Sequence, residues 1–171
     1  MTHVNSSKNS SPEVILLTEE DWARYRDIRL AALVHDEGAF GGDYDSESQY
    51  SEAQWRQKAQ QYVGLLATID GKDCGFMTIE NLKGDFGATC WVGSCWVDPK
   101  FRNGGVLRSL FTFADLCSAE RNWQVQGLGV WVDNSGAIAA YEKIGFERMG
   151  EQQLSTRKPG MYYQRMIRSV K

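Results

Sequence analysis

The sequence predicts an α/β (α+β) fold with a mixed, mostly antiparallel central sheet of about seven strands, flanked by about four helices. Two observations lead to this prediction. Helical and strand-like segments follow one another in the order β-α-α-β-β-β-α-β-α-β-β. Short turns join the three middle strands, which favours antiparallel pairing, whereas the next strand follows a helical crossover, which favours a parallel neighbour.

The first third of the chain predicts one strand and two helices. Residues 14–17 form an apolar run long enough for a strand. Thr18 can cap a helix that continues at helical spacing to about Val34. After a loop rich in Gly, Asp and Ser, a capping box opens a second helix over residues 51–61.

The middle of the chain predicts a three-stranded meander. Alternating and β-branched residues indicate strands at residues 62–69, 74–81 and 87–97, separated by turns that contain Gly and Asp. Pro99 closes the third strand.

After Pro99 the pattern predicts a helix, a strand, a second helix and two final strands. The first of these helices, within residues 102–122, should bury one face formed by Val106, Leu110, Phe113 and Leu116 or Cys117. The remaining segments are expected at residues 127–132, 134–144, 146–151 and 161–167.

The 171 residues suit one domain, and no linker or internal repeat divides them. We expect residues 13–171 to form that single domain. Residues 1–12 are polar and rich in Ser, so they are expected to be a disordered N-terminal tail.

Composition argues against several classes of protein. Nineteen Lys and Arg against 22 Asp and Glu leave a net charge of −3, which argues against a dedicated nucleic-acid binder. No apolar run or hydrophobic leader suggests a membrane span or secretion, so a cytoplasmic location is expected. The four cysteines form no C-x-x-C pair and there are two histidines, so we expect no metal site and reduced thiols.

The first chemistry-bearing segment is the glycine-rich turn between the third meander strand and the following helix. Backbone N–H groups at the start of a helix form a natural phosphate site, and Gly104 and Gly105 would let a ligand approach closely. Arg102 and Arg108 could pair with phosphate oxygens. The alternative interpretation is an ordinary strand-to-helix turn with solvated arginines.

The second segment is a helix capped by Asn134 and stopped by Gly145. It carries Tyr141 among small and apolar residues. The alternative here is a core-packing helix with a half-buried tyrosine.

Taken in register, the two segments resemble the GNAT superfamily of N-acetyltransferases over residues 14–168. The pattern V-x-P-x-x-R-x-x-G is matched by Val97, Pro99, Arg102 and Gly105. The pattern N-x-x-A-x-x-x-Y-x-x-x-G-F is matched by Asn134, Ala137, Tyr141, Gly145 and Phe146. One departure is Leu107, which stands where the family has Gly or Ala and would crowd a pyrophosphate unless its side chain points away.

The resemblance implies a GNAT-like fold and acetyl-CoA as co-substrate. The residues it assigns to the pyrophosphate, through their backbone amides, are Arg102, Asn103, Gly104, Gly105, Val106 and Leu107. Those it assigns to the pantetheine arm and the rest of the cofactor are Cys95, Trp96, Val97 and Asn134.

The same resemblance implies that Tyr141 protonates the departing thiolate, a role that suits a phenol with an ordinary pKa near 10. The general base stays open between Glu80, at the end of a meander strand, and a chain of water molecules. Glu80 could equally be an exposed strand-end carboxylate. Cys95 as an acyl-carrying nucleophile is a further alternative, although no histidine lies near it in the sequence.

The implied function is transfer of an acetyl group to a primary amine of a small molecule or peptide, by direct attack in a ternary complex. A catalytically silent CoA-binding sensor or interaction domain is the alternative, supported by Leu107, whereas a generic nucleotide-binding module fits the glycine positions poorly. The resemblance also admits a homodimer. Six acidic residues between positions 36 and 52 predict either a negative rim that attracts a cationic amine or a plain solvated loop.

Overall fold

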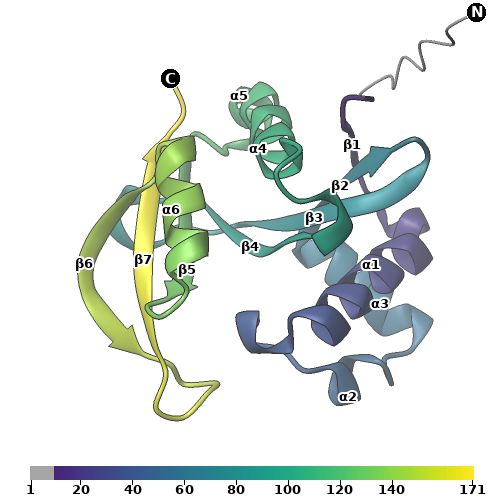
Figure 1. The fold of residues 1–171 in the computed structure, drawn as a ribbon, viewed down its shortest axis with the longest axis horizontal. Helices are drawn as coiled ribbons and strands as arrows, with labels where there is room; N and C mark the ends of the chain where they lie inside the picture. Colours follow the sequence, from purple (N-terminus) through teal and green to yellow (C-terminus); the bar gives the residue numbers. More distant parts are fainter. Residues whose placement is uncertain (1–9) are drawn as a thin grey trace, which may run out of the picture.

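A seven-stranded sheet with the order β1-β2-β3-β4-β5-β7-β6 runs through the molecule in the computed structural model, which describes residues 10–171 (Figure 1). The predicted tail therefore lies almost wholly outside the described residues. The strands are β1 Glu13–Leu16, β2 Val63–Ile69, β3 Lys72–Asn81, β4 Cys90–Val97, β5 Val125–Trp131, β6 Glu147–Leu154 and β7 Tyr162–Ser169.

The predicted fold class is confirmed. All neighbouring strands pair antiparallel except β4 and β5, which are parallel as the helical crossover predicts. The helices are α1 Trp22–His35, α2 Tyr44–Glu47, α3 Glu52–Gln61, α4 Val106–Leu116, α5 Ser118–Arg121 and α6 Ser135–Ile144. Four short 3₁₀ turns lie at Glu19–Asp21, Glu37–Ala39, Asp85–Gly87 and Pro99–Phe101.

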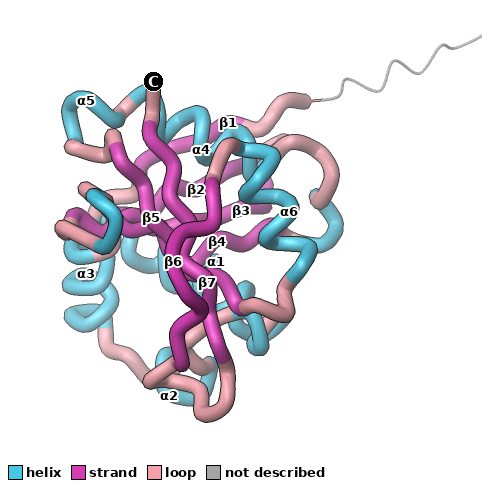
Figure 2. Tube along the Cα trace, turned by 90° about the vertical axis from the view of Figure 1, so that its left-hand side faces the viewer, coloured by secondary structure: helices cyan, strands magenta, loops and turns pink. Residues whose placement is uncertain are grey.

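The helices cover the sheet on both faces. Figure 2 shows the strands between α3 on one side and α6 on the other. One core cluster joins α1 and α3 to the sheet through Tyr25, Trp55 and Phe76. The second joins α4 and α6 to the opposite face through residues such as Leu110 and Leu128.

Local signals placed most helix ends correctly. Ser51 and Gln54 form the predicted capping box of α3, and Tyr50 packs on Trp55 with ring centroids 5.4 Å apart. Gly145 ends α6 in the left-handed region at φ 113°, where a residue without Cβ is favoured.

The predicted buried face of the helix after Pro99 is confirmed: Val106 and Leu110 are buried, and Phe113 packs against the core cluster. Phe111 and Ala114 extend this face, whereas Leu116 is 80% exposed. Cys117 is the member of the predicted pair that packs against the core. The chain also breaks after Leu116, so the segment forms two helices rather than one.

Within the described residues, no helix is both long enough and apolar enough to cross a membrane.

Candidate active site

The site begins where β4 and β5 separate. The two strands pair only at Cys90 with Gln126 and at Trp91 with Gly127, and they diverge beyond those positions. A cavity of about 690 Å³ opens there, between the end of β4, the start of α4, α6 and the segment after α1. The predicted site residues that line it are Cys95, Trp96, Val97, Arg102, Asn103, Gly105, Val106, Leu107, Asn134 and Tyr141.

The turn before α4 and the first turn of that helix line this cavity. Asn103 and Gly105 both adopt the left-handed conformation, at φ 64° and 79°, and no side chain caps the helix. The first-turn N–H groups of α4 therefore lack an intrahelical acceptor. They lie at the N-terminus of the helix, where the helix dipole favours anions. The helix can approach β3 closely because Gly75 has no Cβ, which would lie 2.4 Å from a methyl carbon of Val106.

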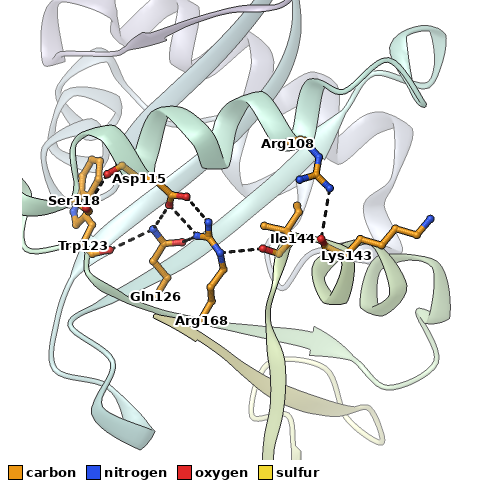
Figure 3. A network of polar contacts seen from close by, with 8 residues as sticks. All are labelled: Arg108, Asp115, Ser118, Trp123, Gln126, Lys143, Ile144 and Arg168. Atoms are coloured by element: carbon orange, nitrogen blue, oxygen red, sulfur yellow. Dashed lines mark hydrogen bonds and ion pairs between the residues drawn. The ribbon is translucent and has the colours of Figure 1, made fainter. Parts of the chain in front are cut away.

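The arginines of the turn are already engaged. Arg102 donates from Nε to the carbonyl of Val97 at 2.9 Å and from Nη2 to Asp36 at 2.8 Å. Arg108 reaches across from α4 toward the carbonyl of Lys143 at the end of α6, at 3.5 Å (Figure 3). Both side chains already donate hydrogen bonds to other protein groups. Backbone amides are therefore the main hydrogen-bond donors that this turn offers to a phosphate.

Leu107 is half-buried and packs against the core cluster under α4 while also bordering the cavity. The side chain therefore has one contact surface on the core and another on the cavity.

The strand that would run beside the pantetheine arm carries a bulge. The register of β3 with β4 shifts between Phe76 and Thr78, and Ser94 sits opposite this shift with φ 55°. Arg29 donates to the Ser94 hydroxyl at 3.0 Å and pairs with buried Glu47. Sequence reasoning missed Arg29, because Ser94, its partner on β4, is 65 residues away in the chain.

Tyr141 and Cys95 meet at the inner end of the cavity. Tyr141 is buried and packs edge-on against Phe111 and Phe146. Burial, reinforced by the neighbouring Cys95 thiol, raises the pKa of Tyr141 well above its usual value. Burial also raises the pKa of Cys95 to about 11, although interaction with the Tyr141 hydroxyl works in the opposite direction.

With raised pKa values, both groups keep their protons at neutral pH, but the consequences for the reaction differ. Tyr141 is protonated at neutral pH and can donate a proton into the cavity. The Cys95 thiol also stays protonated, so it is a poor nucleophile and the acyl-carrying alternative loses support.

Asn134 lines the cavity but uses its side-chain oxygen to cap α6, accepting from the amide of Ala137 at 3.2 Å. Its side-chain NH₂ group is the part left for a ligand.

Glu80 lies apart from the other predicted residues. It pairs in register with Trp91 on β4, on the sheet face that α1 and α3 cover, and accepts from Gln61 at 3.3 Å. Trp91 precedes Cys95 by four residues, which places Glu80 on the order of 10 Å along the strand from the inner end of the cavity. Gly104 is exposed and also lies outside the cavity lining.

The acidic stretch between positions 36 and 52 is not a free negative rim. Four of its six acids are used internally: Asp36 by Arg102, Asp43 as the cap of α2, Glu47 by Arg29 and Lys58, and Glu52 by Arg56. Among residues 10–171, no group of three His, Cys, Asp or Glu side chains is placed to hold a metal ion.

Comparison with known proteins identifies the family. The acetyltransferase (GNAT) domain family matches residues 60–148, just over half of the chain. The chain belongs to the GNAT superfamily of N-acetyltransferases. The GNAT match covers both strands that diverge at the site and both helices that line the cavity.

Individual GNAT proteins show the same relationship. The L-amino acid N-acetyltransferase AaaT of Escherichia coli is 31% identical over 121 residues, which cover 66% of this chain and 72% of that protein. An uncharacterized N-acetyltransferase of Methanocaldococcus jannaschii is 30% identical over 98 residues, 54% of this chain, but the match spans only 42% of that relative. The structure of Salmonella typhimurium yncA with its cofactor acetyl-CoA has a TM-score of 0.69 at 19% identity, covering 95% of each chain.

Proposed function

We propose that this chain transfers the acetyl group of acetyl-CoA to a primary amine of a small molecule or peptide, by direct attack in a ternary complex. The observation that supports this proposal most is that one cavity contains both an anion-binding group and a proton donor. Free amides of the first turn of α4 lie at its outer end, and the protonated Tyr141 hydroxyl lies at its inner end beside Cys95.

The residues present fit acetyl-CoA as a substrate. The amides from Arg102 to Leu107 would hold the pyrophosphate, since an uncapped helix N-terminus is an anion site. The end of β4, at Cys95, Trp96 and Val97, lacks a strand partner on its β5 side and so offers main-chain groups to the pantetheine arm. The NH₂ group of Asn134 would add one side-chain donor.

The chemistry then needs two proton transfers. The acceptor nitrogen forms a bond to the thioester carbonyl carbon, the C–S bond breaks, and Tyr141 donates its proton to the leaving sulfur. The amine must lose a proton, which passes to solvent water directly or along waters toward Glu80. A direct transfer to Glu80 is disfavoured because that carboxylate lies outside the cavity lining.

The relatives suggest which amines to test first. AaaT acts on L-amino acids, according to its name, and we propose small α-amines and peptide N-termini as the first acceptors for this chain. Cationic polyamines are a weaker choice, because Asp36, the acid that lines the cavity, is already paired with Arg102.

The test is release of free CoA from acetyl-CoA with a panel of amines, together with thermal unfolding. Saturating acetyl-CoA should raise the Tm by mass action, and adenosine without phosphates should do much less. Release of CoA that depends on an amine supports acetyl transfer. A Tm increase with no turnover on any amine would favour the sensor or interaction domain instead.

A further inference from the structure

Asp36, at the end of α1, connects three parts of the site. Its Oδ2 accepts from the indole Nε1 of Trp96 at 2.7 Å and from Nη2 of Arg102 at 2.8 Å. Trp96 belongs to the strand beside the proposed pantetheine path, and Arg102 belongs to the turn proposed to hold the pyrophosphate. The neighbouring His35 stacks on Trp96, with ring centroids 6.0 Å apart.

The residues that follow Asp36 cross the opening between β4 and β5. We call residues 36–40 the bridge segment. Trp131, at the end of β5, donates to the carbonyl of Ala39 at 3.1 Å, and Lys158, in the β6–β7 loop, donates to the carbonyl of Glu37 at 3.2 Å. The bridge segment is thus fixed to β4 through Asp36 and to the opposite half of the sheet through two of its carbonyls.

The bridge segment also forms a wall of the cavity. Asp36, Ala39 and Phe40 line it, and Phe40 is buried in the cluster under α1. The same cavity contains Cys95 and Tyr141, so the bridge segment borders the space in which an acceptor amine would meet the thioester.

The charge of Asp36 is neutralised by an ion pair. A carboxylate in a cavity that receives pyrophosphate repels it unless a cation neutralises that carboxylate. Arg102 supplies the neutralising charge, with both side chains partly exposed. Asp36 thus contributes little attraction for the co-substrate, and its two hydrogen bonds serve to place the bridge segment.

We propose that Asp36 is a positioning residue. Through its contact with Arg102 it links the bridge segment, which borders the space for the acceptor amine, to the turn proposed to bind the pyrophosphate. This inference rests on the proposed function. It predicts that occupancy of the pyrophosphate turn orders the bridge segment through Arg102, Trp96 and Asp36.

The first test is Asp36→Asn, which keeps an oxygen for Trp96 but removes the charge that holds Arg102. Acceptor KM should rise about fivefold, which corresponds to a partly exposed ion pair. The Kd of acetyl-CoA should stay unchanged or fall, because Arg102 is freed and the repelling charge is gone. The matched control is Asp27→Asn on α1, and it should change neither constant. Among residues 10–171, the exposed carboxylate of Asp27 pairs only with the neighbouring Arg26.

A purely structural role would give a different pattern, with Tm, acetyl-CoA affinity and acceptor KM all worsening together. That result would overturn the proposal. An acceptor KM within twofold of wild type in a stably folded Asp36→Asn protein would also overturn it.

The second test needs no acceptor and uses amide hydrogen exchange with and without saturating CoA. In wild type, CoA should slow exchange at Val106, Leu107 and Arg108 and also at Ala39 and Phe40, whose amides bond within the bridge segment. In Asp36→Ala, the slowing at α4 should persist and the slowing at Ala39 and Phe40 should disappear.

The outcomes separate the two claims. If CoA slows exchange at α4 in wild type but not in the bridge segment, or if Asp36→Ala keeps both effects, the role of Asp36 is refuted while the proposed function stands. If CoA does not slow exchange at α4 in wild type, the proposed function fails, and the role of Asp36 fails with it.

Discussion

Tyr141 combines a packing role in the core with the proposed role of proton donor. Its ring fills a cluster with Phe111 and Phe146, while its hydroxyl faces the Cys95 thiol at the inner end of the cavity. Burial disfavours the phenolate, so the hydroxyl keeps its proton throughout the neutral range. A general acid needs this state, and a residue that only packed would not need the hydroxyl.

Tyr141→Phe separates these two roles, because it keeps the ring and removes the proton donor. Turnover should fall about 10²-fold, the low end for a positioned general acid, since water can partly substitute. Acetyl-CoA affinity should change little, because the hydroxyl acts mainly as charge develops on sulfur. The measurements are kcat, the Kd of acetyl-CoA and Tm on the same variant, and a wild-type kcat would leave Tyr141 as packing alone.

At this scale the sequence revealed residues that belong to motifs and missed those that act through distant partners. Tyr141, Asn134 and the turn from Arg102 to Leu107 were predicted from the resemblance of their motifs to the GNAT pattern, and the structure brings nearly all of them to one cavity. Asp36 carried no such signal, since its partners are 60 and 66 residues away and only the tertiary fold joins them. The sequence predicted that Arg102 pairs with phosphate oxygens. It did not predict the contact of Arg102 with Asp36, because the two residues are 66 positions apart.

At the scale of elements, α4 and α6 are held together by a polar network at the C-terminal ends of the two helices (Figure 3). Arg168 on β7 pairs with Asp115 of α4, contacts Gln126 of β5 and donates to the carbonyl of Ile144 at the end of α6. The side chain of Arg168 is only 14% exposed. This network fixes the spacing of the two helices that line the cavity.

Arg168→Met tests that network, because it keeps much of the side-chain volume and leaves buried polar partners unpaired. The free energy of unfolding should fall by about 3 kcal/mol, as for loss of one partner from a buried ion pair. The matched control is Arg148→Met, which removes an exposed pair with Glu142 and should cost less than about 1 kcal/mol. Urea unfolding measures both, and equal losses would show that Arg168 has no special structural weight.

Leu107 belongs to the first turn of α4, and its role can be separated by Leu107→Ala, which also restores a small residue at that position. Loss of its half-buried packing should lower the free energy of unfolding by about 1–2 kcal/mol, while Ala maintains helix propensity. Acetyl-CoA affinity should stay within about twofold, because the side chain is anchored in the core. Leu116→Ala, at an exposed position on the same helix, is the control, and a marked gain in affinity for Leu107→Ala would show that Leu107 crowds the phosphates.

Elements were predicted well because their signals are local. Capping boxes, Gly stops and alternating strands depend on neighbouring residues, and these placed all seven strands and the four long helices. The exposed Leu116 and the break before α5 were not predictable in this way. Hydrophobicity alone does not tell which of two adjacent residues turns toward the sheet, and α2 is a single turn held by the Arg29–Glu47 contact.

At the scale of the whole molecule, the order of elements predicted the one parallel pair, but not how briefly it lasts. β4 and β5 meet at two positions and then separate, and this departure from regular pairing creates the cavity. Local sequence patterns do not encode such a divergence, because it depends on the bulge at Ser94 and on helices packed from both sides. A homodimer and a cytoplasmic location stay predictions.

The distribution of charge leads to a final prediction about ionic strength. The chain has a net charge of −3, yet the proposed pyrophosphate site combines helix N-terminal amides with nearby Arg102, Arg108 and Lys143. Salt screens this local attraction, so the Kd of acetyl-CoA should rise between about 0.05 and 0.5 M NaCl. The KM of a cationic amine should stay nearly flat, because three of the six acids expected to form a negative rim, Asp36, Glu47 and Glu52, are ion-paired and Asp43 caps α2. Steady-state kinetics at several salt concentrations, with a neutral-side-chain amine as the control acceptor, measure both. A cationic KM that climbs with salt while the control stays constant would restore the acidic rim, and a salt-independent Kd would remove the electrostatic basis of the phosphate site.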